Sequence, residues 1–405
     1  MPRRRTREPG QPNFFLTPLG IVFTTVVIDL IGFGIVVPIL PLWAEDLGAS
    51  ATIVGVLTAV YSLMQFVFAP ILGRLSDRYG RRPVILASLA GSVVSSLLIG
   101  VANSVALLFV ARILNGISGA SYSTAQAYVA DITTPQTRAR GMGLIGAAFG
   151  IGFVIGPAFG AVFALVDHRL PFIAAAVLAL VNLLIAWKRL PEPERTRGPV
   201  TPRRELFARA MRHPSIAPLV VITFLGTAAF AGMETTFSLL GERRFDFGLA
   251  EAGGVFAFVG IAAAVVQGKA LGPLVDRWGE RTIMLSGLVL TGTALALLAI
   301  TTHLWALFPV AGLLAASGLV FAPVTAMVSK AVPDADQGGT LGVLGSASGL
   351  ARVIGPLAAG ALFDWSVPAP YLVGAGLFLV CLVIALRWGR VPVDAPDRSA
   401  RPSEG

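Results

Sequence analysis

The chain of 405 residues has little of what proteins use for metal binding, disulfide bonding or charged surfaces. It has one cysteine and three histidines, and only 13% of its residues are charged. The lone Cys381 cannot form an intrachain disulfide, and its apolar neighbours favour packing over a reactive or metal-binding role. His168, His213 and His303 lack cysteine or acidic partners at metal-ligand spacing. The sequence therefore predicts no metal site and no cofactor.

Apolar residues dominate instead. They make up 55% of the chain, and the mean hydropathy is +0.78. A water-soluble domain of this length could not bury so much apolar surface in its core. The net charge of +9 might suggest a nucleic-acid partner, but the arginines occupy short loops between apolar runs. That pattern is typical of a membrane protein, so we expect the lipid bilayer as a partner and no nucleic acid.

Twelve apolar runs of roughly 20 residues, the length of a membrane-spanning helix, follow one another along the chain. The first comes after an arginine-rich start, but it is too long for the apolar core of a signal peptide, so we expect it to be retained. No connection has room for a soluble domain. The predicted spans are 17–42, 51–72, 83–101, 105–128, 141–165, 170–188, 215–240, 250–271, 281–300, 304–329, 338–362 and 369–387.

The longest connection, rich in Pro, Arg and Glu, divides these spans into two groups of six. The predicted fold class is an all-α membrane protein of twelve transmembrane helices in two pseudo-symmetric six-helix bundles. Most of the 31 Lys and Arg residues fall on the side of the N-terminus, which places both termini in the cytoplasm. The predicted parts are an N-terminal tail (1–16), a first bundle (17–188), a linker (189–214), a second bundle (215–388) and a C-terminal tail (389–405).

The two halves carry an internal repeat. The charged loop 73–82 returns as 272–281, with Asp77 and Asp276 standing 199 residues apart. The same offset aligns a second, distant motif in the two halves. Its glycines and proline are Gly143, Gly146, Gly150, Gly156 and Pro157, which align with Gly342, Gly345, Gly349, Gly355 and Pro356. Duplicated bundles with a pathway between them are the usual build of a secondary transporter.

These motifs resemble those of the major facilitator superfamily, in particular its twelve-span drug:H+ antiporters. Segment 73–82 resembles the signature between helices 2 and 3, and 108–116 resembles the helix 4 motif with its intramembrane arginine. Segment 150–160 resembles the antiporter motif of helix 5, and 29–41 resembles the helix 1 motif of drug exporters. The resemblance covers about residues 15–390 and implies the fold and the export function, but not the substrate.

Two acids are candidates for proton coupling. Asp29 lies in the middle of an apolar span, where a charge costs about 2.5–3.5 kcal/mol. An apolar surrounding favours the protonated carboxyl, so Asp29 can bind and release a proton. Glu234 is the mid-span acid of the second half, and we expect it to face Asp29 across a central cavity, with Arg352 as a possible partner. Alternatively, Glu234 lies near the outer interface with Glu242.

Arg112 is the third coupling candidate, because its guanidinium stays charged and needs a partner inside the span. It could tune the proton affinity of Asp29. The alternatives are a permanent structural pair with Asp29 or simple bracing of the bundle.

The loop repeat is a candidate conformational latch. The resemblance implies that it joins the halves on the cytoplasmic side and favours the outward-open state. The bland alternative is that its arginines only set the topology. The candidate latch residues are Gly73, Asp77, Arg78, Gly80 and Arg81, with Asp276 and Arg277 in the second copy.

The antiporter motif of helix 5 is rich in small residues. The stretch 141–146 formally matches a dinucleotide-binding pattern, but no strand precedes it, so its context excludes that function. Gly150, Gly156 and Gly160 instead allow close helix packing, and Pro157 bends the helix. We expect a seam between the halves here.

Aromatic and polar side chains on the expected cavity helices are candidate substrate contacts. For each of them, packing or lipid contact is the alternative. The candidates are Phe33, Tyr61, Asn115, Tyr122, Gln126, Phe149, Phe230 and Phe237.

The predicted function is proton-coupled export of small amphipathic compounds across the inner membrane by alternating access, carried out by a monomer that is not an enzyme. Two acids in one cavity would favour lipophilic cations. The alternatives are a tetracycline-specific exporter, a sugar or metabolite exporter and, more distantly, a membrane receptor or enzyme. Segment 128–140 resembles tetracycline exporters, but the spans 83–101 and 281–300 lack the acids that those exporters carry.

Overall fold

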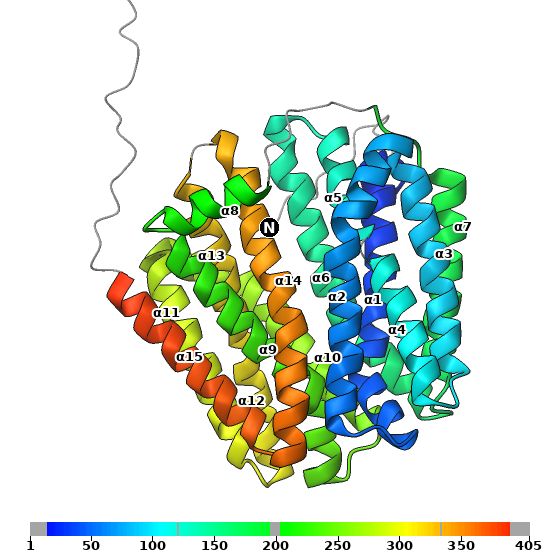
Figure 1. Cartoon of the computed structure of the whole chain (residues 1–405), viewed down its shortest axis with the longest axis vertical. Coiled ribbons are helices and arrows are strands. Elements are labelled where there is room, and N and C mark those ends of the chain that lie inside the picture. Colours follow the sequence, from blue (N-terminus) through cyan, green and yellow to red (C-terminus); the bar gives the residue numbers. More distant parts are fainter. Residues whose placement is uncertain (1–13, 120, 195–202, 333, 389–405) are drawn as a thin grey trace, which may run out of the picture.

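A computed structural model describes residues 14–119, 121–194, 203–332 and 334–388, and all regular structure in them is helical (Figure 1). Short 3₁₀ turns span Phe14–Leu16 and Ala315–Ser317, and a π-helical turn spans Val266–Ala270. The α-helices are α1 (Pro18–Asp46), α2 (Ala51–Tyr79), α3 (Arg81–Gly100), α4 (Val105–Gly119), α5 (Ser121–Ile132), α6 (Pro135–Ala164), α7 (Leu170–Arg189), α8 (Arg203–Arg212), α9 (Ala217–Phe245), α10 (Leu249–Val265), α11 (Leu271–Ile300), α12 (Leu304–Leu314), α13 (Gly318–Lys330), α14 (Asp334–Trp365) and α15 (Ala369–Trp388).

The described residues contain 11 helical runs that are long and apolar enough to cross a membrane. The run Leu249–Ile300 is 52 residues long and covers two of the predicted spans. At about 1.5 Å per residue it is more than twice as long as a ~30 Å hydrocarbon layer is thick. The run also bends at Gly279, where φ is 76°. Each of the remaining runs corresponds to one predicted span.

The predicted linker contains a helix that hydropathy did not indicate. Helix α8 is short and strongly basic, and it packs against α9 and α14. The predicted N-terminal tail lies almost entirely outside the described residues, and the predicted C-terminal tail lies wholly outside them.

Helices α1–α7 pack largely against one another, and most of α9–α15 do the same, whereas α10 packs chiefly against α6 of the first set (Figure 1). The two sets meet through three main pairs of helices, α1 with α9, α2 with α14 and α6 with α10. The first pair joins elements that correspond at the offset of 199 residues, whereas α2 meets α14, the counterpart of α6, and α6 meets α10, the counterpart of α2. The pathway suggested by the internal repeat would have to run between these pairs.

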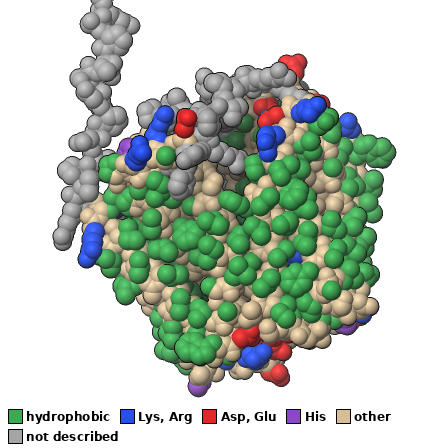
Figure 2. Space-filling view, in the orientation of Figure 1, with side chains coloured by type: hydrophobic (Ala, Val, Ile, Leu, Met, Phe, Trp, Pro, Cys, Tyr) green, Lys and Arg blue, Asp and Glu red, His purple; other side chains and the backbone are tan. Residues whose placement is uncertain are grey.

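The surface has a broad apolar band between two charged ends (Figure 2). Large hydrophobic side chains such as Val177, Ile261 and Leu379 are more than half exposed. So much exposed apolar surface is expected of a lipid-facing protein. We call the end with Arg74, Arg140 and Lys330 the basic end, and the end with Glu45 and Asp364 the acidic end.

Small residues bring the two sets of helices together toward the acidic end only. A Cβ on Gly55 of α2 would lie 2.4 Å from the Pro356 carbonyl oxygen of α14, and one on Gly260 of α10 would lie 2.6 Å from the Phe153 oxygen of α6. Toward the basic end, a Cβ on Gly146 or Gly342 would meet no described atom within 4 Å. The sets are therefore in contact near the acidic end and apart near the basic end.

The glycines of α6 allow a matched test of this packing. A Cβ on Gly156 would lie 2.7 Å from the backbone of Gly34 in α1, whereas one on Gly146 would meet nothing. Gly156→Ala should destabilise the protein by about 1–3 kcal/mol through overpacking. Gly146→Ala should be neutral or stabilising by up to about 1 kcal/mol, because alanine favours the helix. Thermal unfolding in detergent compares the two, and equal melting temperatures would contradict the packing.

Candidate functional site

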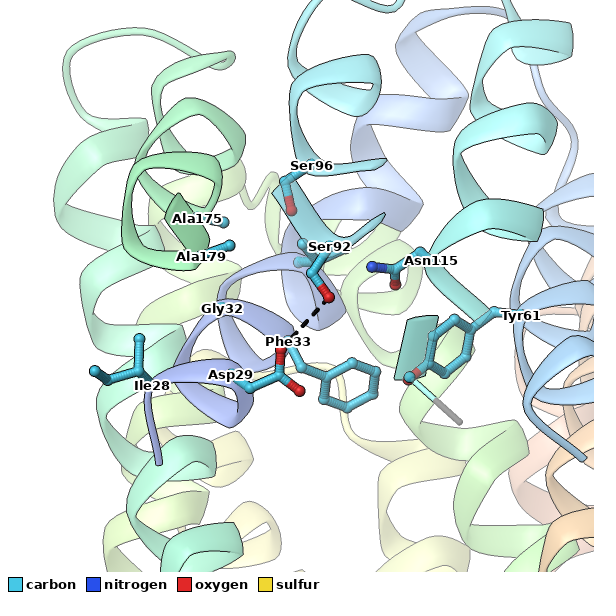
Figure 3. Close-up of a pocket in the computed structure, with 12 residues that line it drawn as sticks. Ile28, Asp29, Gly32, Phe33, Tyr61, Ser92, Ser96, Asn115, Ala175 and Ala179 are labelled. Carbon is cyan, nitrogen blue, oxygen red and sulfur yellow. Dashed lines mark hydrogen bonds between the residues drawn. The ribbon is translucent and has the colours of Figure 1, made fainter. Parts of the chain in front are cut away.

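Asp29 lies in a small cavity enclosed by helices from the first half of the chain (Figure 3). Its volume is about 40 Å³. One water molecule needs about 10–15 Å³, so the cavity has room for more than one. The Ser92 hydroxyl lies 3.5 Å from the Asp29 carboxylate. The lining residues are Ile28, Asp29, Gly32, Phe33, Val36, Tyr61, Ser92, Ser96, Asn115, Gly119, Ala175 and Ala179.

Arg112 does not form an ion pair with Asp29 in the described part of the chain. Its guanidinium carbon lies 4.3 Å from the centre of the Tyr61 ring. It also donates to the Leu57 carbonyl at 3.5 Å and to Asn115 Oδ1 at 3.4 Å. Arg112 is thus compensated by an aromatic face and neutral acceptors. The direct Asp29–Arg112 pair considered from the sequence is not the arrangement in this structure.

A chain of polar side chains nevertheless connects the two groups. Arg112 donates to Asn115, and Asn115 Nδ2 donates to the Ser95 hydroxyl at 3.0 Å. Ser95 in turn donates to the Ser92 carbonyl at 3.1 Å, and the Ser92 hydroxyl donates to Asp29. The Ser92 carbonyl accepts one bond and the Ser92 hydroxyl donates another, so the hydrogen bonds are not continuous from Arg112 to Asp29. We call this set of contacts the polar relay.

Only weak signals in the sequence pointed to the relay. Asn115 was predicted as a cavity residue, and it does line the cavity beside Asp29. Ser92 and Ser95 were missed, although their spacing of three places them on one face of α3. Both serines lie in the predicted span 83–101, for which only the missing acid of the tetracycline exporters was considered.

Four of the predicted substrate contacts form part of a continuous row of rings. The ring centroids of Tyr61 and Phe33 are 5.5 Å apart, and those of Phe33 and Phe153 are 5.9 Å apart. Phe153 stacks on Phe149 at 5.0 Å, and Phe149 meets Tyr122 at 6.2 Å. We call these five residues the aromatic row. It runs across helices α2, α1, α6 and α5.

Other predicted contacts lie elsewhere. Phe237 is only 3% exposed and packs edge-on against Phe256, with centroids 5.4 Å apart, so it belongs to the core. Phe230 also packs against this core. Gln126 hydrogen-bonds Tyr122 at the end of the aromatic row.

Glu234 faces Arg352 of α14, with 3.9 Å between the nearest nitrogen and oxygen. Arg352 also interacts electrostatically with Tyr61, which belongs to the first half. Glu242 lies about 12 Å further along α9 and contacts Glu45 instead, so Glu234 and Glu242 do not form a pair. The lining of the Asp29 cavity contains no residue of α9–α15. Glu234 is thus not among the residues that line the Asp29 cavity, and the expected shared cavity stays a prediction.

The acidic end holds the two halves together through a carboxylate. Asp364 of α14 accepts from the Ala51 and Thr52 backbone amides at 3.0 and 2.8 Å, and from the Thr52 hydroxyl at 2.5 Å. These amides are at the start of α2, where N–H groups lack helical partners and an anion is favourable. We call this contact the acidic-end clasp. An ion pair between Arg243 and Glu45, 2.9 Å apart, joins α9 and α1 at the same end.

The predicted latch loop turns at Gly80, whose φ is 118°. Asp77 pairs with Arg81 at 2.6 Å, and Arg81 also pairs with Asp131 at 2.8 Å. Glu192, beyond α7, accepts from the Arg81 amide at 2.7 Å and so caps the start of α3. Asp131 and Glu192 were not predicted as site residues. Asp131 belongs to the first half and Glu192 to the start of the linker after α7, and neither contact reaches a helix of the second half.

The remaining candidates of the loop repeat are at the molecular surface. Arg78 stacks on Tyr79, and Arg277 stacks on Trp278, 5.3 and 5.6 Å from the ring centres. Asp276 is exposed, and a Cβ on Gly73 would meet nothing within 4 Å.

The antiporter motif supplies both close contacts and open positions. Gly160 packs against Ile39 of α1, and Gly156 and Pro157 meet Gly34 of the same helix. Gly150 has no described neighbour within 4 Å. The motif thus packs against α1 within the first half and, through Phe153 and Pro157, against the α10 glycines Gly260 and Gly253 of the second half, where a seam between the halves was expected.

Comparison with known proteins is consistent with this architecture. Residues 22–271 and 269–404 match the Major Facilitator Superfamily. The tetracycline resistance protein, class C, of Escherichia coli is 37% identical over 385 residues, which are 91% of this chain and 96% of that protein. Multidrug resistance protein 2 of Bacillus subtilis (strain 168) is 29% identical over 385 residues, 93% of this chain and 96% of that protein.

Among solved structures, the human organic anion transporter MFSD10 (TETRAN) has a TM-score of 0.70 and 27% identity, covering 93% of this chain and 100% of that one. The multidrug and tetracycline resistance relatives and the apolar helices together identify a membrane transporter related to drug exporters. The chain belongs to the Major Facilitator Superfamily.

Proposed function

We propose that the protein is a proton-coupled exporter of small amphipathic compounds. The observation that carries the proposal is the position of Asp29, which lies in a cavity among apolar helices without an ion-pair partner among the described residues. Such a carboxyl can take up a proton when it loses access to water and release it when access returns. The resistance proteins among the relatives support export as the direction.

We also propose a twelve-span arrangement with two six-helix bundles, residues 17–188 and 215–388. The long run Leu249–Ile300 would cross the bilayer twice, turning at Gly279, the counterpart of Gly80 in the repeat. The basic end would face the cytoplasm of an inner membrane, since lysine and arginine favour that side. Both chain termini would then be cytoplasmic.

The uneven contact between the halves supports alternating access. The acidic end is held by the clasp and by the Glu45–Arg243 pair, whereas the glycines near the basic end have no neighbours across the gap. This corresponds to a state open to the cytoplasm. Transport would require the clasp to open and the basic end to close, with Asp77 and its loop acting as a latch in the other state.

Asp29→Asn should abolish proton-driven export, because the amide cannot carry the proton. In inside-out vesicles, uptake of substrate driven by a pH gradient should fall to background, with protein levels unchanged. Asp46→Asn, an exposed carboxyl at the acidic end, is the matched control and should keep its activity. Gradient-driven transport by Asp29→Asn at the normal rate would rule out the assignment.

Asp364→Ala should destabilise the state closed at the acidic end. Hydrogen bonds to charged groups contribute about 1.5–3 kcal/mol when sheltered, and Asp364 is partly exposed, so we expect a several-fold shift. A cysteine at position 146, in a Cys381→Ser background, should then react more slowly with a water-soluble maleimide. Asp246→Asn, at an exposed position of the same end, should leave the rate unchanged. An unchanged rate in Asp364→Ala would show that the clasp does not bias the conformations.

Asp77→Asn should lower turnover more than substrate affinity, because a latch acts on the conformational equilibrium. Asp276→Asn should be milder, since the second copy has Pro273 and Glu280 at signature positions. Steady-state export separates kcat from KM in both variants. A raised KM with unchanged kcat in Asp77→Asn would count against the latch.

Tetracycline export is a second candidate, favoured by the identity with the class C resistance protein. Ser92 and Ser96 lie in the span where the acid of tetracycline exporters was expected, and they line the Asp29 cavity. A susceptibility panel in an exporter-deficient host separates the candidates. Protection against tetracyclines alone would favour the narrow function, and protection against unrelated compounds the broad one.

A further inference from the structure

Arg352 points into the space between the two halves. On α14, Ser348 lies 3.3 Å from Thr227 of α9, while Gly349 packs against Phe66 of α2. One turn further, Gly355 packs against α9 and Pro356 against Gly55 of α2. Position 352 lies between these two faces of the helix, since successive residues are about 100° apart. Its side chain is therefore directed at the gap between α2 and α9.

The charge of Arg352 is only loosely compensated. The distance of 3.9 Å to Glu234 is too long for a hydrogen bond, and the Arg352 side chain is 37% exposed. A guanidinium has five N–H donors, and no hydrogen bond among the described residues uses one from Arg352. This differs from Arg112, which is buried and bonded to two acceptors. Arg352 can thus receive an additional anionic partner in a forked geometry.

Two aromatic residues of α2 lie near Arg352 and its neighbour Gly349, Tyr61 within electrostatic reach of the guanidinium and Phe66 against the glycine. Tyr61, within electrostatic reach of Arg352, is the first member of the aromatic row and stacks on Phe33. Stacked rings favour a planar aromatic ligand. Arg352 would then lie beside an acidic substituent of that ligand.

The positive charge of Arg352 argues against the sequence-based expectation that the substrates are lipophilic cations. A lipophilic cation would meet Arg352 beside Glu234, the acid that should attract it. The second acid, Asp29, lies in a cavity lined only by the first half. Of the two charges beside the gap, the guanidinium of Arg352 is the more accessible, with 37% of its side chain exposed against 13% for Glu234.

We propose that the gap between Arg352 and the aromatic row binds planar aromatic compounds carrying an ionised acidic group, as anions or zwitterions, in preference to lipophilic monocations. The proposal rests on the proposed export function and names its substrate class. Arg352 would pair with the acidic group, the aromatic row would stack on the ring, and Glu234 would accept a positive substituent of a zwitterion.

A free-acid rhodamine and its methyl ester test the proposal, because they share one ring system and differ in a single carboxylate. Their affinities for the purified protein in lipid nanodiscs are measured by fluorescence anisotropy. We expect the acid to bind at least about tenfold more tightly, the effect of a charge-assisted hydrogen bond. Arg352→Gln should remove that preference by weakening the acid alone, and Arg352→Lys should retain part of it.

Ser346→Ala, at a half-buried position on another face of α14, is the control and should change neither affinity. The proposal would be overturned if the wild-type protein bound the ester more tightly than the acid, or if it bound neither dye. It would also be overturned if Arg352→Gln weakened the affinities for the two dyes equally. If Arg352→Gln does not fold, Arg352→Lys and the wild-type comparison still decide. The binding assay needs no pH gradient, so its result does not depend on proton-driven export. The binding site could therefore be confirmed while proton-driven export is refuted, or refuted while proton-driven export is confirmed.

Discussion

The cost of a charge inside an apolar helix bundle governs the placement of the functional groups in this protein. Each such charge must be paired, hydrogen-bonded or neutralised. Arg112 is satisfied by the Tyr61 ring and by neutral acceptors, which leaves Asp29 without a direct counter-ion. Arg352 and Glu234 compensate one another only at a distance. Asp29 and Arg352 are thus the mid-span charges with the weakest compensation. In the proposed function, Asp29 can bind a proton and Arg352 can bind an acidic group of the ligand.

Packing of small residues determines where the halves can meet. Toward the acidic end, glycines such as Gly55 allow backbone contact between the halves, and Asp364 adds charge-assisted hydrogen bonds. Toward the basic end, the corresponding glycines of α6 and α14 face open space. Glycine at these open positions has no packing role in this state. It is consistent with a second state in which the same surfaces come into contact, which is the reciprocal closure that alternating access requires.

Much of the fold could be predicted from apolar length and loop charge, and the predicted spans agree well with the helices. Orientation of side chains about each helix could not, because α1 and α9 are apolar on all sides and have no polar face to fix their rotation. For that reason Asp29 and Glu234 were expected in one cavity, and Phe237 was expected outside the core. Thr52 lies 312 residues from its partner Asp364, and Arg81 lies 111 residues from its partner Glu192. Only tertiary packing brings the members of each pair together.

In the proposed transport cycle, closure at one end of the molecule excludes closure at the other. Distances between spin labels at both ends measure this directly, in a Cys381→Ser background. One pair of labels at positions 143 and 342 reports on the basic end, and another at 166 and 365 reports on the acidic end. On a pH change or on addition of substrate, the account predicts that one distance shortens as the other lengthens. Distances that change in the same direction, or one that changes while the other stays fixed, would contradict it.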